Sequence, residues 1–439
     1  MPENKLYIET YGCQMNVVDS EVVVAILQQH HYQLTEDINE ADLVLVNTCS
    51  IRDNAEQRIK SRLRDFRKLK GQKRSVSIGV IGCMAERLKE KLLEDEPIVD
   101  LVVGPDAYRE LPALLQEVES GQKGINTILS LKETYDDIQP VRMDRNHVSS
   151  FVSIMRGCNN FCAYCVVPGT RGRERSRDPE TIIMEATDLF SKGYREVTLL
   201  GQNVNSYRWK EGDSLLKFEK LLERVADIDP SFRVRFATSH PKDMSDDLLK
   251  VISQYPNLCK SIHLPVQSGS TTVLQRMKRR YTREHYMERI SAIHNYLPGA
   301  SISTDIITGF CGESEEEHQQ TLSLMEWAQY DLAYMFKYSE RPETFAAEKL
   351  KDDVPEAVKT QRLNEIIELQ GKLSLESKKR DVGQSFEVLV EGTSKKSEEQ
   401  LYGRTSQNKV VVFPKNDLKP GDYTEVTIKE CTSATLIAH

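Results

Sequence analysis

Short apolar strands alternate with helical stretches through most of this chain, and this alternation limits its possible folds more than any other feature. Near the amino terminus, strand-like runs at residues 5–12, 41–48, 75–82 and 99–104 are separated by helical patterns. Repeated strand–helix units of this kind form a parallel sheet with helices on both faces. We therefore expect a doubly wound parallel-sheet domain over residues 1–125.

A second strand–helix series begins near residue 149. Six strand-like runs are separated by helical stretches such as residues 179–193 and 282–296. Six units are fewer than the eight of a complete barrel, so we expect a partial (β/α)6 barrel over residues 149–375. Its chemistry should lie at the carboxyl ends of the strands. The intervening segment, 126–148, loses the periodicity and reads as a connector.

The end of the chain changes to strand-like runs separated by turn residues. This pattern predicts a small all-β barrel over residues 376–439. No segment of the sequence approaches the roughly 18 uninterrupted apolar residues of a spanning helix. The amino terminus also lacks the basic and apolar regions of a signal peptide. We therefore expect a cytoplasmic protein without a membrane anchor.

The nine cysteines favour metal binding over disulfides, because the cytoplasm keeps thiols reduced. The strongest pattern is Cys158, Cys162 and Cys165, a Cys-x3-Cys-x2-Cys run directly after the first barrel strand. Three thiolates can hold three irons of a four-iron cluster and leave one iron open, whereas a structural zinc site takes a fourth protein ligand. The run therefore favours an open iron-sulfur cluster over zinc or a simple electron-transfer cluster.

Three further cysteines, Cys13, Cys49 and Cys83, each follow a strand of the predicted amino-terminal sheet. The carboxyl ends of parallel strands meet at one edge, so these thiols should converge there as a second metal site. Widely spaced cysteines are more often unrelated core thiols, and only the strand-end placement favours ligation. The remaining cysteines are expected to be packed, inert thiols: Cys259, Cys311 and Cys431.

The Cys158 run, with Tyr164 before its last cysteine, resembles the radical S-adenosylmethionine superfamily. The resemblance implies that the open iron binds the amino and carboxylate groups of S-adenosylmethionine, whose reductive cleavage yields methionine and a 5′-deoxyadenosyl radical. Polar side chains at the other strand mouths are candidates to orient this cofactor, and the alternative for each is an ordinary strand-end hydrogen bond. The candidates are Gln202, Asn203, Ser239, Gln267 and Asp305.

Over essentially its whole length the chain resembles the methylthiotransferase family. The matching text includes Gly12-Cys13-Gln14-Met15-Asn16, Asn47-Thr48-Cys49 and Tyr164-Cys165-Val166-Val167-Pro168, which is typical of the branch that modifies isopentenyladenosine beside the anticodon of transfer RNA. The resemblance implies an amino-terminal cluster domain, a radical barrel and a carboxy-terminal TRAM RNA-binding domain. Departures from the family text at Gly169, Cys311 and Glu343 leave the shape of the substrate pocket open.

The same resemblance implies two four-iron, four-sulfur clusters, one on each cysteine trio, and no side-chain acid or base. One S-adenosylmethionine methylates a sulfur species at the amino-terminal cluster, and a second supplies the radical that removes hydrogen from C2 of the adenine. Such an enzyme needs a low-potential electron donor, a sulfur source and the anticodon stem-loop of a transfer RNA. Alternatives are the same chemistry on threonylcarbamoyladenosine or a ribosomal protein, and a noncatalytic iron-sulfur RNA-binding protein.

The formal net charge of −8 argues against RNA binding by bulk charge, so any RNA contact must come from local basic patches. Residues 57–74 hold nine Lys or Arg against one Asp. Two further candidates are the arginines between Arg171 and Arg177, and the run from Arg276 to Arg280. For each patch the alternative is an ordinary solvated face.

Overall fold

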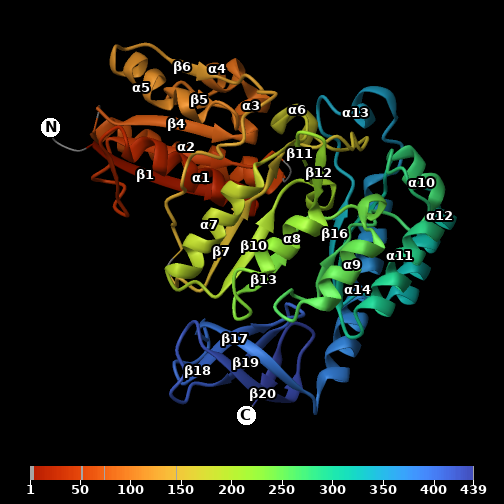
Figure 1. The fold of residues 1–439 in the computed structure, drawn as a ribbon. Helices are drawn as coiled ribbons and strands as arrows, with labels where there is room; N and C mark the ends of the chain where they lie inside the picture. Colours follow the sequence, from red (N-terminus) through yellow and green to blue (C-terminus); the bar gives the residue numbers. More distant parts are fainter. Residues whose placement is uncertain (1–3, 51–52, 74, 145, 439) are drawn as a thin grey trace.

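The computed structural model describes residues 4–50, 53–73, 75–144 and 146–438, with residues 53–57 described by their backbone alone. Arg74 and the side chain of Gln57, both in the predicted basic run, lie outside the described residues. Figure 1 shows three parts in chain order: an amino-terminal sheet in red and orange, a barrel in yellow to blue-green, and carboxy-terminal strands in blue.

Six parallel strands form the amino-terminal sheet and confirm the predicted doubly wound domain. Two edge strands of three residues were not predicted, β2 (Tyr32–Leu34) and β6 (Gly124–Asn126), because so short a strand shows no alternating pattern. In spatial order the strands are β2 (Tyr32–Leu34), β1 (Asn4–Tyr11), β3 (Leu43–Thr48), β4 (Ser77–Gly82), β5 (Leu101–Val103) and β6 (Gly124–Asn126).

Helices cover both faces of this sheet. Leu43 and Leu45 of β3 belong to one core, whereas Val44 and Val46 belong to another, because successive side chains of a strand point to opposite faces. The first core is covered by α1 (Gln14–Gln28) and α5 (Leu111–Glu119), and the second by α2 (Asp53–Gln72), α3 (Cys83–Leu88) and α4 (Glu90–Asp95). Burial of both faces leaves the carboxyl edge of the strands for ligands.

The six predicted barrel strands are present and form two parallel three-stranded sheets. A parallel bridge from Val234 to Leu258 extends the first sheet toward the second. The first sheet contains β7 (Ser149–Ser153), β10 (Glu196–Leu200) and β13 (Arg233–Phe236); the second contains β14 (Ser261–His263), β15 (Ser301–Thr308) and β16 (Leu332–Lys337).

Helices and short antiparallel pairs complete the barrel. The pairs were not predicted: β8 (Met155–Arg156) with β9 (Arg175–Ser176), and β11 (Arg208–Glu211) with β12 (Ser214–Lys217). The helices are α6 (Val167–Arg171), α7 (Pro179–Ser191), α8 (Phe218–Ala226), α9 (Asp246–Gln254), α10 (Thr271–Arg276), α11 (Arg283–Tyr296), α12 (Glu315–Ala328), α13 (Phe345–Lys349) and α14 (Glu356–Asp381). Short 3-10 helices in the barrel include η2 (Val204–Ser206) and η3 (Pro241–Asp243), whereas η1 (Tyr108–Glu110) lies in the amino-terminal domain before α5.

The carboxy-terminal strands close into the predicted small barrel. In spatial order they are β17 (Ser385–Thr393), β18 (Gln400–Thr405), β19 (Val410–Pro414), β21 (Leu436–Ala438) and β20 (Tyr423–Cys431). Arg233, at the start of β13, donates to the backbone oxygen of Arg404 at 2.8 Å, and Arg235 donates to that of Thr405 at 2.7 Å. The small barrel thus packs at the amino ends of the β10 and β13 strands (Figure 1). No helix in the described parts of the chain is both long and apolar enough to cross a membrane.

Candidate functional site

The strand order brings Cys13, Cys49 and Cys83 to one edge of the amino-terminal sheet. They follow β1, β3 and β4, which are neighbours in the sheet. Cys49 and Cys83 are buried, whereas Cys13 is exposed. A hydrogen bond with Cys49 and the nearby charge of Arg171 lower the pKa of Cys13 to about 6. A lowered pKa favours the thiolate, the form that binds metal.

Two buried asparagines, Asn16 and Asn47, hold the loops that carry these cysteines. The Asn16 amide donates to Asn47 Oδ1 at 2.9 Å, and the Cys13 backbone N–H donates to Asn16 Oδ1 at 3.3 Å. A Cβ on Gly82, which has a φ of +92°, would lie 2.4 Å from Asn47 Oδ1, so this position before Cys83 requires glycine. Sequence reasoning gave these asparagines no role, although each stands close to a cysteine in the chain.

Cys158, Cys162 and Cys165 lie on the loop between β8 and α6. The Asn160 backbone N–H donates to Cys158 Sγ at 3.4 Å, and Arg279 Nη1 donates to Cys162 Sγ at 3.3 Å. Burial is the main cause that raises the pKa of Cys165 to about 12. Because a ligand thiol must lose its proton, metal binding at this loop would release protons.

The donor sets of both trios fit iron-sulfur clusters. Thiolate ligands select zinc or iron-sulfur clusters over harder metals. No group of three His, Cys, Asp or Glu side chains among the described residues is arranged to hold a single metal ion. A four-iron cluster is larger than one ion, so its thiolates stand farther apart. Each trio supplies three thiols, which leave one iron of a four-iron cluster without a protein ligand, whereas a structural zinc site takes four protein ligands.

The prediction that the arginines between 171 and 177 contact RNA is wrong for three of the four. Arg171, Arg175 and Arg177 are 3%, 7% and 6% exposed, and only Arg173 is exposed to solvent. The buried three form ion pairs with Asp19, Asp106 and Glu185, respectively. A run of basic residues resembles a solvated face in the sequence when its acidic partners lie far away in the chain. Here two of the partners, Asp19 and Asp106, lie in the amino-terminal part.

The predicted patch from Arg276 to Arg280 is likewise only partly at the surface. Arg279 is 5% exposed and is bound to Cys162 and to the backbone oxygen of Pro265, while Met277 is fully buried. The run at 57–74 fits the prediction better: α2 buries Ile59, Leu63, Phe66 and Leu69, and exposes Arg58, Lys60, Arg64, Arg67 and Lys68. Its contact with RNA stays a prediction.

A buried ionic cluster joins the amino-terminal sheet to the barrel beside both cysteine trios. Asp19 of α1 lies 2.9 Å from Arg156 Nη1 and accepts a 2.7 Å hydrogen bond from Arg171 Nη2. Arg171 also donates through Nε to Cys83 Sγ at 3.1 Å. The helix α6, which ends at Arg171, follows Cys165 almost directly, and it lies beside α3, which begins at Cys83 (Figure 1).

Four of the five candidate cofactor residues carry a buried polar atom without a hydrogen-bond partner among the described residues. Native proteins pair nearly all such atoms, so several unpaired ones at the ends of barrel strands fit a polar ligand. Asp305 differs, because its Oδ1 lies 3.5 Å from His263 Nε2. The four atoms are Gln202 Oε1, Asn203 Oδ1, Ser239 Oγ and Gln267 Oε1.

Sequence reasoning missed His240, which directly follows Ser239. Its Nε2 is also buried and unpaired among the described residues, and its Nδ1 accepts from the Lys242 backbone N–H at 3.3 Å. Burial, and secondarily the charge of Arg279, lowers the pKa of His240 to about 2, so the ring stays neutral. The signal in the sequence that could have identified His240 is its position after β13, directly beside Ser239.

The inner face of the β14–β15–β16 sheet carries polar and apolar side chains side by side. The strand register pairs Asp305 with Tyr334 on this face, whereas Ala333 is buried in the core on the opposite face. Leu332, Tyr334 and Phe336 alternate along β16 and are 45%, 48% and 42% exposed. The last strand of the open barrel therefore presents an apolar row beside a candidate cofactor residue.

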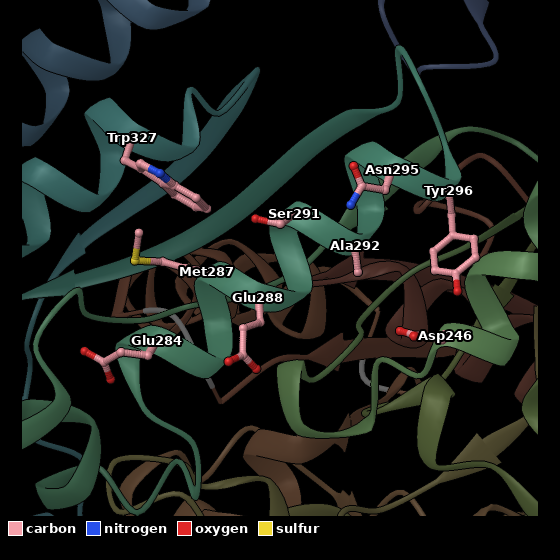
Figure 2. Close-up of a pocket in the computed structure, with 9 residues that line it drawn as sticks. All are labelled: Asp246, Glu284, Met287, Glu288, Ser291, Ala292, Asn295, Tyr296 and Trp327. Atoms are coloured by element: carbon pink, nitrogen blue, oxygen red, sulfur yellow. The ribbon is translucent and has the colours of Figure 1, made fainter.

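A separate hollow of about 710 Å³ lies on the outside of the barrel between α9, α11 and α12. Figure 2 shows Met287 and Trp327 at one end of it and Asp246 and Tyr296 at the other. None of its lining residues is a cysteine or a candidate cofactor residue. This hollow is therefore not part of the site.

Comparisons with known proteins cover all three parts of the chain. Residues 5–104 match the Uncharacterized protein family UPF0004, residues 152–325 the Radical SAM superfamily and residues 379–439 the TRAM domain. The Phocaeicola vulgatus tRNA-2-methylthio-N(6)-dimethylallyladenosine synthase is 60% identical over 433 residues, which cover 98% of this chain and 95% of that protein. The Bacteroides fragilis protein of the same name is 58% identical over 433 residues, covering 98% and 94%.

Among solved structures, the chain is similar to TsrM, a radical S-adenosylmethionine methyltransferase from Kitasatospora setae, solved with tryptophan and an S-adenosylmethionine analogue. The TM-score is 0.59 at 14% identity, with 79% of this chain and 75% of that chain covered. Identity this low shows a shared fold and nothing about the substrate.

Proposed function

Because the chain belongs to the family of tRNA-2-methylthio-N(6)-dimethylallyladenosine synthases, we propose that it attaches a methylthio group to C2 of an N6-isopentenyladenosine beside the anticodon. It is a radical S-adenosylmethionine enzyme that acts on transfer RNA as a methylthiotransferase. Enzymes of this superfamily use S-adenosylmethionine with a four-iron, four-sulfur cluster. The proposal adds the second cluster, the ligands of both clusters and the place of the substrate adenosine.

We assign one cluster to Cys13, Cys49 and Cys83, and the other to Cys158, Cys162 and Cys165. The observation that carries this assignment is the 3.1 Å hydrogen bond from Arg171 of the barrel to Cys83 of the amino-terminal sheet. It supports two thiol trios on adjoining edges, as a reaction with two clusters requires. The proposal includes the four chain segments inferred from the sequence: residues 1–125, 126–148, 149–375 and 376–439.

When bound, the barrel cluster with S-adenosylmethionine supplies the radical, and the amino-terminal cluster supplies the iron that holds sulfur. The protein's own contribution is positioning. Asn203, Ser239 and Gln267 offer buried unpaired oxygens that would accept or donate hydrogen bonds to the polar groups of S-adenosylmethionine. The neutral ring of His240 adds an unpaired nitrogen at the same strand end without adding charge.

The substrate base would reach the inner face of the last barrel sheet. A base in a single-stranded loop can be splayed into a pocket at low cost. The exposed row of Leu332, Tyr334 and Phe336 offers apolar surface for the isopentenyl group, beside Asp305. Exposed cations on α2 and the carboxy-terminal barrel would hold the rest of the anticodon arm through its phosphates.

The test is an anaerobic reaction of the reconstituted enzyme with S-adenosylmethionine, reductant and sulfide. Matched anticodon stem-loops carrying isopentenyladenosine, threonylcarbamoyladenosine or plain adenosine serve as substrates, and the digested nucleosides are identified by mass. We expect the methylthio product from the isopentenyl RNA alone. A product only from the threonylcarbamoyl RNA would reassign the substrate, and 5′-deoxyadenosine without any methylthio RNA would point to another substrate such as a ribosomal protein.

A further inference from the structure

We propose that Arg279 is the counter-ion of the barrel cysteine site, and that it raises the reduction potential of a cluster held by Cys158, Cys162 and Cys165. It acts on the cluster through the sulfur of Cys162, so it is a positioning residue for the reaction. The inference rests on the proposed function, because it assumes that these three cysteines hold the cluster. It assigns to one buried arginine the task of making that cluster easier to reduce.

The side chain of Arg279 is fixed against Cys162 by hydrogen bonds from each of its three nitrogens. Nε donates to the Tyr281 hydroxyl at 3.0 Å, and Nη2 donates to the backbone oxygen of Pro265 at 2.8 Å. Nη1 donates to Cys162 Sγ at 3.3 Å. The residue is only 5% exposed. The guanidinium therefore presents one nitrogen to the sulfur while the other two anchor it to the barrel.

The positive charge of Arg279 is not paired with a carboxylate among the described residues, since its acceptors are a hydroxyl, a backbone oxygen and a sulfur. Arginine stays protonated in proteins, and a buried charge without an opposite charge is strongly unfavourable. Of the three acceptors, the Cys162 thiol is the one that loses its proton when metal binds. Every other buried arginine in the described part of the chain pairs with Asp or Glu: Arg156, Arg171, Arg175, Arg177, Arg233, Arg235 and Arg362.

A buried cation beside one ligand changes the redox balance of a cluster. The electron comes from the low-potential donor that the reaction needs, and it adds a negative charge to a cluster already held by three thiolates. A positive charge in a buried site stabilises the more negative state, and an N–H donor to a ligand sulfur acts in the same direction. The charge of Arg279 therefore favours the reduced cluster, and its loss should make the cluster harder to reduce.

Arg362 provides a matched control in the same part of the chain. It is also 5% exposed, and its Nη1 donates to the backbone oxygen of Glu313 at 2.9 Å and to Glu313 Oε1 at 3.0 Å. Its Nη2 donates to Glu315 Oε2 at 3.3 Å. Arg362→Gln thus removes a buried guanidinium whose hydrogen bonds go to oxygen. A purely structural role for Arg279 would make substitutions of the two arginines alike in their effect on the reduction potential.

The experiment uses the full chain with Cys13, Cys49 and Cys83 all replaced by Ala, so that only the barrel cluster can form. Iron content and the electron paramagnetic resonance spectrum of the reduced cluster are measured first. An anaerobic redox titration followed by this spectrum then gives the midpoint potential of the parent and of its variants. Arg279→Gln and Arg279→Met both remove the charge, so either can be measured if the other does not fold, whereas Arg279→Lys keeps the charge.

We expect the neutral variants to keep their iron and to lower the equilibrium constant for one-electron reduction roughly tenfold, a fall of about 59 mV in midpoint potential. Arg279→Lys should fall less, and Arg362→Gln should match the parent. Three results would overturn the inference and leave the proposed function standing: an unchanged midpoint in a neutral variant, an equal fall in Arg279→Lys or Arg362→Gln, and loss of iron from both neutral variants. Absence of iron from the parent with the three Ala substitutions would overturn the proposed function, and the inference with it.

Discussion

Arg156 and Asp19 are both buried, and Arg156 Nη1 lies 2.9 Å from Asp19 Oδ1. Arg156 ends the short strand that leads into the Cys158 loop, and Asp19 lies on the helix that follows Cys13. One carboxylate therefore ties together the segments that carry the two cysteine trios. The relative position of the trios depends on this pair and on Arg171, and not on loop contacts alone.

Replacement of Asp19 by Asn should destabilise the protein strongly. Arg171 would keep a buried charge without its carboxylate and Arg156 would keep only its 3.7 Å ion pair with Asp106, and breaking a buried pair in this way costs about 3–5 kcal/mol. We expect a lower urea midpoint for Asp19→Asn. The control is Asp65→Asn, which removes an exposed pair with Arg62 and should cost about 1 kcal/mol or less. Equal effects of the two substitutions would contradict a structural role for Asp19.

Glu86 should make stability depend on pH. Burial raises the pKa of this carboxyl to about 7, from 4.5 in an unfolded chain. Between these values the folded protein binds the proton more tightly, so the associated stability is full below about pH 4.5 and is lost as the pH rises through about 7. We expect Glu86→Gln to gain stability over the parent as the pH is raised from about 5 to about 8. A difference that stays constant over this range in urea unfolding would contradict the raised pKa.

Ser239→Ala should separate cofactor binding from stability. The Ser239 hydroxyl is buried and unpaired among the described residues, so its loss should not lower the free energy of unfolding. We expect S-adenosylmethionine to bind about two- to tenfold more weakly, the effect of one hydrogen bond. The control is Ser245→Ala, whose hydroxyl accepts from the Leu248 N–H at 3.2 Å as a helix cap. It should lose about 1 kcal/mol of stability and keep its affinity.

Charge reversal on α2 tests the remaining basic patch. Arg64→Glu and Lys68→Glu change exposed cations on the solvent side of the helix. If these side chains touch phosphates, each reversal should weaken binding of transfer RNA and reduce the slope of log affinity against log salt by about 0.7–0.9. Lys372→Glu, at an exposed position on α14, is the control and should leave the slope unchanged. If Arg64→Glu and Lys68→Glu keep the salt slope of the parent, as Lys372→Glu should, the exposed cations of α2 form an ordinary solvated face.

The strands and the cysteine positions could be predicted because they depend on local patterns. A continuous apolar run marks β3, apolar alternation marks β15, and glycine followed by cysteine marks the ends of β1, β4 and β8. The roles of Arg171 and Arg279 could not be predicted in this way. Each lies in a run of basic residues that resembles a solvated face in sequence. The acceptors that reveal its role lie far away in the chain: Asp19 and Cys83 for Arg171, and Cys162 for Arg279.

The candidate cofactor residues illustrate the same limit. Strand-end position alone singled out Ser239 and Gln267, whose buried atoms are unpaired among the described residues. It did not single out His240, because a histidine beside a strand end is common and only its burial reveals that the ring stays neutral. The exposed apolar row of Leu332, Tyr334 and Phe336 on β16 could not be predicted either. A strand with an exposed apolar face has the same sequence pattern as a fully buried strand.

The most direct measurement compares Cys13→Ala with Cys162→Ala in the anaerobic reaction on isopentenyladenosine stem-loop RNA. Both 5′-deoxyadenosine and the methylthio nucleoside are quantified by mass. We predict that Cys13→Ala still forms 5′-deoxyadenosine but makes no methylthio nucleoside, whereas Cys162→Ala forms neither. Two results would contradict the division of the reaction between two cysteine trios. One is a normal amount of methylthio nucleoside from Cys13→Ala, and the other is loss of 5′-deoxyadenosine in Cys13→Ala while Cys162→Ala still forms it.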